Sequence, residues 1–154
     1  MQEQNLELKK RLLAECLKIQ NGIVGNARNA MNEAHESALE YDEAAEDNMV
    51  DSYREEMQSK RDMFARQLEH SLEDLALLHK VITDKEQDTA IFGAVVITES
   101  QKLFVCISLG LLKVDGEQFF AISPAAPIFK AISGLRKGDS FNFRDKQVKI
   151  IDLF

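Results

Sequence analysis

The first 90 residues of the chain contain no proline and only two glycines, Gly22 and Gly25. Apolar residues recur through this segment in steps of three and four, which is the spacing of a helix that buries one face. When such steps alternate, they form the heptad pattern of a coiled-coil seam. The segment therefore predicts long helices and leaves little room for strands or tight turns.

The apolar residues of this segment form two runs with a short polar break between them. The first run extends from Leu6 to Ala38, with leucine and isoleucine early and alanine later. Two runs joined in this way predict an antiparallel helical hairpin. With about 35 residues, each arm would be on the order of 50 Å long. The second run comprises Met49, Tyr53, Met57, Phe64, Leu68, Leu72, Leu75, Leu78 and Ile82.

The two glycines are the weak point of the first arm. Each costs roughly 1 kcal/mol relative to alanine inside a helix. A kink or a break into two helices at Gly22 and Gly25 is therefore the alternative to one continuous helix, which we favour.

The leucines of the second arm lead to a prediction about burial. Leu72, Leu75 and Leu78 are expected to be buried, either in the seam or against the domain that follows. Glu69 and Glu73 are expected to face solvent. Helical periodicity separates the two groups, because residues three or four apart share a face.

After residue 88 the composition changes to short β-rich runs with many β-branched and aromatic residues. Turn signals such as VDGE and RKGD separate them, and PAAPIFKAIS predicts one short helix with Gly134 just past its end. We expect five strands and one helix. The fold class is α+β, with a coiled-coil hairpin over residues 1–84 and a strand-rich domain over 89–154. The strand-rich runs are IFGAVVIT, KLFVCISLGLL, QFFAIS, DSFNF and QVKIIDLF.

Charge is distributed unevenly between these two parts. Residues 1–88 hold 20 acidic and 11 basic side chains, whereas residues 89–154 hold 6 and 8. The balances of −9 and +2 suggest two modules with separate roles, and they argue against a general nucleic-acid binder, which would be basic.

No apolar run is long enough to cross a membrane and none resembles a signal peptide. Cys16 and Cys106 are interpreted as separate buried thiols, so a cytoplasmic protein is expected.

The 25 residues between Arg28 and Arg54 contain eight carboxylates and no lysine or arginine. The most acidic part, near residues 40–51, falls where the hairpin would turn. A solvated turn kept soluble by its charge is the ordinary interpretation. Carboxylate oxygens are also the preferred protein ligands of Mg²⁺, which makes a metal-binding tip the alternative.

One stretch of the second half carries a specific resemblance. SPAAPIFKAISGLRKGDSFNF, at residues 123–143, resembles the C-terminal domain of the bacterial Gre transcript-cleavage factors, of the GreA and GreB type. FGAVVIT is similar to the first strand of that domain. The order of parts also agrees, and the resemblance implies an FKBP-like fold for residues 89–154. FKBP-like folds include prolyl isomerases, whose substrate pocket has a tryptophan at its floor. This chain has no tryptophan, so isomerase activity is not expected.

The resemblance implies a partner and a function. A Gre factor docks its C-terminal domain at the rim of the RNA polymerase secondary channel, through residues that correspond here to Ser123 and Pro124. Its hairpin enters the channel, and tip acids help to hold a Mg²⁺ ion of the polymerase active site. The polymerase then cleaves the backtracked RNA, so the factor assists the reaction and is not itself an enzyme. We expect it to act as a monomer. Basic residues on the arm, here Arg54, Lys60 and Arg61, would contact the nascent RNA 3′ end.

Alternatives remain open for the tip acids, for the arm cations and for the protein as a whole. Asp47 and Asp51 correspond most closely to the pair of tip acids that holds the metal in the family. They are four residues apart, whereas the family's pair is three residues apart. Glu43 or Glu46 could therefore take the place of either. The same tip could block the channel and inhibit the polymerase without stimulating cleavage. The arm cations could also be ordinary partners of neighbouring acids. A purely structural coiled-coil adaptor would leave the motif at residues 123–143 unexplained.

Overall fold

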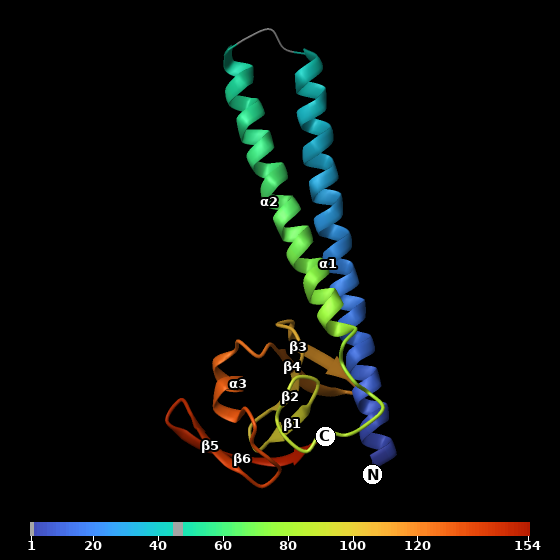
Figure 1. Cartoon of the computed structure of the whole chain (residues 1–154), viewed down its shortest axis with the longest axis vertical. Coiled ribbons are helices and arrows are strands. Elements are labelled where there is room, and N and C mark those ends of the chain that lie inside the picture. Colours follow the sequence, from blue (N-terminus) through green and yellow to red (C-terminus); the bar gives the residue numbers. More distant parts are fainter. Residues whose placement is uncertain (1, 45–47) are drawn as a thin grey trace. The chain divides into compact units, whose positions relative to one another are not determined.

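The computed structural model describes residues 2–44 and 48–154, with side chains described except at positions 38 and 40–51. Two long helices come first and a strand-rich part follows, so the predicted α+β class is confirmed (Figure 1). The helices are α1 (Gln2–Ala44) and α2 (Asn48–Leu78). The later elements are β1 (Val95–Thr98), β2 (Lys102–Val105), β3 (Gly110–Val114), β4 (Glu117–Ile122), α3 (Pro127–Ile132), β5 (Ser140–Phe143) and β6 (Lys146–Leu153).

Helix α1 is continuous across Gly22 and Gly25, as predicted. Val24, which lies between the two glycines, is buried. Burial of apolar side chains of this size contributes roughly 1.5–3 kcal/mol each, enough to offset the weak helix propensity of a neighbouring glycine.

The chain packs into two compact units. One comprises residues 1–19 and 76–154, which we call the head unit. The other comprises residues 20–75, which we call the hairpin unit. These units differ from the ranges 1–84 and 89–154 taken from the sequence, because the first turns of α1 pack with the sheet.

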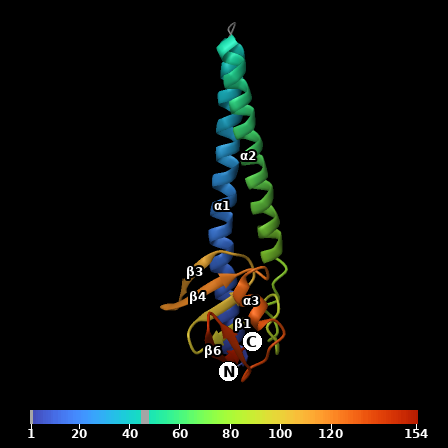
Figure 2. The same ribbon diagram turned by 90° about the vertical axis from the view of Figure 1, so that its left-hand side faces the viewer.

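Within the hairpin unit, α1 and α2 run antiparallel and side by side in both views (Figure 1; Figure 2). A hydrogen bond joins Gln20 to Ser71 and another joins Arg61 to His35. Low residue numbers on α1 therefore lie opposite high numbers on α2. The predicted antiparallel hairpin is confirmed.

One predicted seam residue is wrong. Leu72 is 39% exposed, and its neighbour Ser71 is buried instead at 4%. The step after Leu68 is three residues and not four, so a polar residue takes the seam position. Leu75 is half-buried and Leu78 is fully buried. The predicted exposure of Glu69 and Glu73 is confirmed.

The sheet of the head unit has six strands in the order β3-β4-β2-β1-β6-β5, and not the five strands expected. All neighbours are antiparallel except β2 and β4, which are parallel. The expected single run KLFVCISLGLL forms two strands, β2 and β3, because the chain turns at residues 106–109. Gly110 begins β3 with φ of +75°, a conformation that favours glycine.

Both faces of this sheet are covered within the head unit. On one face, Leu12 and Cys16 of α1 pack in a cluster with Phe104 and Phe119. On the other face, α3 contributes Ile132 to a second cluster. Adjacent residues of β2 belong to different clusters, as the two-residue period of a strand requires. The first turns of α1 are thus part of the core of the head unit.

Helix α3 begins with Pro127 and is followed by Gly134 at φ of +76°, which confirms the predicted short helix. The next turn is closed by a side chain, since Asp139 Oδ2 accepts a 2.8 Å hydrogen bond from the Arg136 backbone N–H. Among the residues that the structure describes, no helix is long and apolar enough to cross a membrane.

Candidate functional site

The predicted acidic tip lies where the two long helices are joined. Helix α1 ends at Ala44 and α2 begins at Asn48. Glu46 and Asp47, and the side chains of Glu43 and Asp51, lie outside the described residues. Their role as Mg²⁺ ligands therefore stays a prediction. Among the described side chains, no group of three or more His, Cys, Asp or Glu residues is arranged to hold a metal ion.

The predicted RNA-contacting cations lie on α2 with differing surroundings. Lys60 Nζ lies 3.8 Å from Glu56 Oε1, one helical turn away, and both side chains are at least half exposed. An exposed pair of this kind contributes at most about 1 kcal/mol. Lys60 therefore has an ordinary acidic neighbour, as one of the two interpretations expected, and it remains accessible. Arg54 is half-buried on the same helix.

Arg61 makes a contact across the hairpin that the sequence analysis missed. Its Nη1 donates to His35 Nδ1 on α1 at 3.4 Å. The two residues are 26 positions apart in the sequence, so the spacing within one helix does not predict their contact. The contact holds the guanidinium of Arg61 against α1 in the hairpin unit.

A buried polar contact sets the register of the two arms. Gln20 Nε2 donates to the backbone oxygen of Ser71 at 2.8 Å, and Ser71 Oγ donates to the backbone oxygen of Leu68 at 2.8 Å. Both polar residues are nearly fully buried. A polar residue in an apolar seam favours one alignment, because any slip leaves its hydrogen-bonding groups without partners. The signal was present in the sequence, since Gln20 occupies a seam position between Cys16 and Val24.

The predicted polymerase-binding residues form an outward-facing turn between β4 and α3. Ser123 Oγ accepts a 3.3 Å hydrogen bond from the Ala125 N–H. The backbone oxygen of Ser123 accepts a 3.0 Å hydrogen bond from the Ala126 N–H. Ser123 thus holds the turn together while Pro124 is exposed. A rigid exposed proline is suited to contact another protein, because little conformational freedom is lost on binding.

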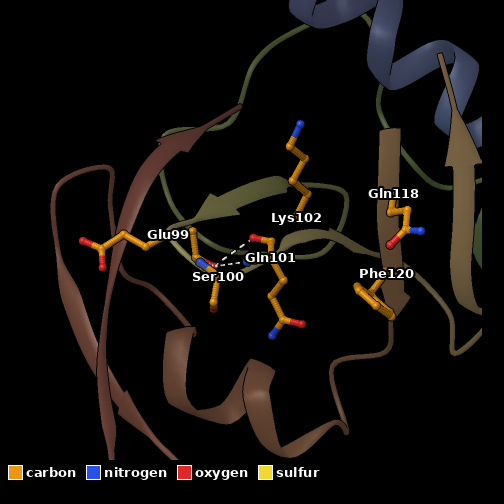
Figure 3. Close-up of a pocket in the computed structure, with 7 residues that line it drawn as sticks. Glu99, Ser100, Gln101, Lys102, Gln118 and Phe120 are labelled. Atoms are coloured by element: carbon orange, nitrogen blue, oxygen red, sulfur yellow. Dashed lines mark hydrogen bonds between the residues drawn. The ribbon is translucent and has the colours of Figure 1, made fainter. Parts of the chain in front are cut away.

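The head unit also carries a pocket of about 260 Å³ between the β1–β2 turn and β4 (Figure 3). The turn is built by Thr98, whose Oγ1 accepts hydrogen bonds from the Ser100 and Gln101 N–H groups and donates to the Gln101 oxygen. The pocket is lined by Thr98, Glu99, Ser100, Gln101, Lys102, Gln118 and Phe120.

The side chains around this pocket suit hydrogen bonding more than acid–base chemistry. Figure 3 shows Gln118 and Phe120 on β4 and Gln101 on the facing turn. Lys102 points away from them, and its Nζ lies near Glu117 and over the Phe119 ring. The seven described lining residues include no histidine or cysteine. Besides Glu99, Lys102 and the hydroxyls of Thr98 and Ser100, the pocket is lined by two amides and one aromatic ring.

Comparisons with known proteins give little further information. No protein-family model matches the chain, and no curated protein sequence matches it. Among solved structures, a structure of the transcription factor Gfh1 is similar, with a TM-score of 0.34 and 17% sequence identity. The match covers 89% of this chain and 92% of that chain. A TM-score this low does not establish a common fold, so no role is transferred from Gfh1.

Proposed function

We propose that this protein is a Gre-like factor that binds RNA polymerase at its secondary channel and stimulates cleavage of backtracked RNA. One observation carries the proposal. The acidic stretch of 25 residues that contains no lysine or arginine spans the connection between two long antiparallel helices. The second half of the same chain resembles the Gre docking domain. Eight carboxylates with no lysine or arginine among them make this stretch strongly negative, so it attracts cations and positively charged surfaces.

The acids at this connection are suited to a hard divalent cation. Mg²⁺ is usually bound by one or two carboxylates, with water and substrate phosphate completing an octahedron. Asp47 and Asp51 are the proposed ligands, and Glu43 and Glu46 are their nearest substitutes. A Mg²⁺ ion shared with the polymerase would supply activated water and charge neutralisation for phosphodiester hydrolysis. The polymerase performs the hydrolysis, so the factor is not an enzyme in this proposal.

Docking is assigned to the turn at Ser123 and Pro124. The turn is preformed by two hydrogen bonds and exposes Pro124. Arg54, Lys60 and Arg61 are the proposed contacts to the nascent RNA 3′ end. Lys60 could exchange its weak pairing with Glu56 for an RNA phosphate, because an exposed ion pair gives up little on separation.

The experiment uses a stalled, backtracked elongation complex with labelled RNA. Adding the full-length protein is expected to accelerate the release of short 3′ RNA fragments. A lack of any effect on release, or a lack of binding to the polymerase, would contradict the proposal. Slower release than the intrinsic rate of the polymerase would instead support the inhibitor alternative, in which the tip occupies the channel without assisting cleavage.

A further inference from the structure

Strand β3 is an edge of the six-stranded sheet, with β4 on one side and, among the described residues, no strand on the other. It is joined to β4 by a two-residue turn, Asp115 and Gly116, in which both residues have positive φ. A turn of this kind belongs to a regular hairpin, in which hydrogen-bonded pairs alternate with pairs that are not hydrogen-bonded. Every second residue of β3 therefore directs its backbone N–H and C=O away from β4.

The hydrogen bonds of β4 show which residues these are. The Ala121 oxygen accepts a 3.3 Å hydrogen bond from the Leu109 N–H, directly before β3. The next oxygen along β4, that of Ile122, accepts a 2.8 Å hydrogen bond from the Cys106 N–H, directly after β2. The odd-numbered residues of β4 thus direct their backbone groups toward β3, and the even-numbered residues direct theirs toward β2.

The outward backbone groups of β3 belong to Leu111 and Lys113. The odd-numbered residues of β4 lie opposite Gly110, Leu112 and Val114, whose backbone groups therefore face β4. Outside β4, no described residue hydrogen-bonds to the backbone of Leu111 or Lys113. A row of unpaired N–H and C=O groups on an edge strand is a template for a further strand.

The side chains of the same two residues lie on the surface. Leu111 is 47% exposed and lies directly opposite Phe120, which is half-buried. Lys113 is exposed and forms no ion pair with a described carboxylate. The carboxylate nearest to it in sequence, that of Asp115, is paired with Arg11 at 2.8 Å. The edge thus presents an apolar side chain and an ammonium group, two residues apart on one face.

The other edge of the sheet has a different surface. It is formed by β5, whose fully exposed side chains are those of Ser140 and Asn142. Neither is apolar or charged, so this edge gives a partner strand less to recognise. The edge at β3 is the more selective of the two.

We propose that β3 is a docking edge for an extended segment of a partner protein, which adds to the sheet antiparallel to β3 and places an acidic residue opposite Lys113 and an apolar residue opposite Leu111. Backbone hydrogen bonds would supply the affinity, and the two cross-strand pairs would supply the specificity. The inference is independent of the function proposed above.

Lys113 also favours such a segment over a second copy of this chain. Strand β3 has the sequence GLLKV and contains no carboxylate, so no pairing of two β3 strands places an acid opposite Lys113. A register that brings the two lysines together is repulsive, and lysine on an edge strand discourages self-pairing. An acidic residue in the partner turns the same lysine into an attractive contact.

The test measures amide hydrogen exchange of the full-length protein by NMR, with two synthetic peptides as probes. The peptides are acetyl-Thr-Thr-Glu-Thr-Val-Thr-amide and the same sequence with lysine in place of glutamate. In the free protein, the amides of Leu111 and Lys113 should exchange at least about tenfold faster than those of Leu112 and Val114. The glutamate peptide should slow exchange at Leu111 and Lys113, and it should bind about tenfold more tightly than the lysine peptide.

A charge-reversal variant tests the role of the lysine. Lys113→Glu should bind the lysine peptide more tightly than the glutamate peptide. Lys149→Glu is the matched control, because it reverses the same charge at an exposed position on β6 and should keep the wild-type preference.

Several results would overturn the inference. These are no binding of either peptide, equal binding of both peptides to the wild-type protein, and binding that leaves the amides of Leu111 and Lys113 unprotected. Protection of these two amides that increases with protein concentration in the absence of peptide would also overturn it, because a second copy of the chain would then occupy the edge.

Discussion

Lys9 is a charged residue without exposed surface in the head unit. Its Nζ lies 3.5 Å from the backbone oxygen of Lys85. Burial lowers the pKa of Lys9 from 10.5 to about 8, although attraction to Glu86 acts in the opposite direction. Between these values the unfolded chain binds more protons than the folded one, so folding stability rises as pH increases from about 8 to 10.5.

Replacing this lysine should remove that dependence. Lys9→Met is expected to stabilise the protein at pH 7, by up to about 3 kcal/mol, and to flatten the rise above pH 8 relative to wild type. Urea unfolding at several pH values measures both effects. Lys10→Met is the matched control, because Lys10 is exposed and neighbours Lys9 in sequence. A wild-type profile no steeper than that of Lys9→Met would contradict the burial of a charged amine.

Two leucines on the same helix should respond differently to truncation. Leu78 is fully buried in the core of the head unit, whereas Leu72 is 39% exposed. Leu78→Ala is expected to reduce the free energy of unfolding by about 2–5 kcal/mol. Leu72→Ala should change it by less than about 0.5 kcal/mol. Chemical denaturation of the two variants measures the difference, and equal losses would show that the burial of these two leucines is assigned incorrectly.

At the scale of elements, the glycines of α1 provide a test of its continuity. A Cβ added at Gly22 or Gly25 would meet no heavy atom within 4 Å. Alanine at either position should therefore stabilise the helix by roughly 1 kcal/mol, since glycine is the weaker helix former. Thermal unfolding of each variant measures the gain. If α1 bent at this point in solution, the substitution would lower stability instead.

The helices and the short helix α3 could be predicted because their signals are local. Apolar steps of three and four defined α1 and α2, and proline and glycine marked the ends of α3. The turn between β2 and β3 could not be predicted, because KLFVCISLGLL is a uniform β-rich run. Its division depends on pairing, since β2 is parallel to β4 whereas β3 is antiparallel to it.

The candidate site was predictable only in part. Ser123 and Pro124 were identified from a motif, and the structure places them on one turn. The contact of Arg61 with His35 and the burial of Ser71 depend on tertiary packing, which spacing along the chain does not encode. The apolar pattern predicts Leu72 on the seam, whereas the helix geometry places Ser71 there.

At the scale of the whole molecule, docking and tip chemistry are assigned to different parts of the chain. Pro124→Glu should weaken competition with wild-type protein for RNA polymerase at least tenfold, which corresponds to about 1.4 kcal/mol. The added carboxylate would be desolvated at the contact. Gln147→Glu is the matched control, since it adds the same charge at an exposed position on β6. Equal competition by both variants would move the docking surface elsewhere.

The central claim is that tip carboxylates help to hold a catalytic Mg²⁺ ion, and a Mg²⁺ titration of RNA cleavage tests it most directly. The comparison is between wild type and the double variant Asp47→Asn with Asp51→Asn, in a backtracked elongation complex. The double variant Glu33→Gln with Glu36→Gln is the control, because it removes the same charge from the same stretch at described, exposed positions. The Asp47/Asp51 variant should bind the polymerase normally and should lose stimulation far more at limiting than at saturating Mg²⁺. Equal stimulation by all three proteins at every Mg²⁺ concentration would contradict the claim.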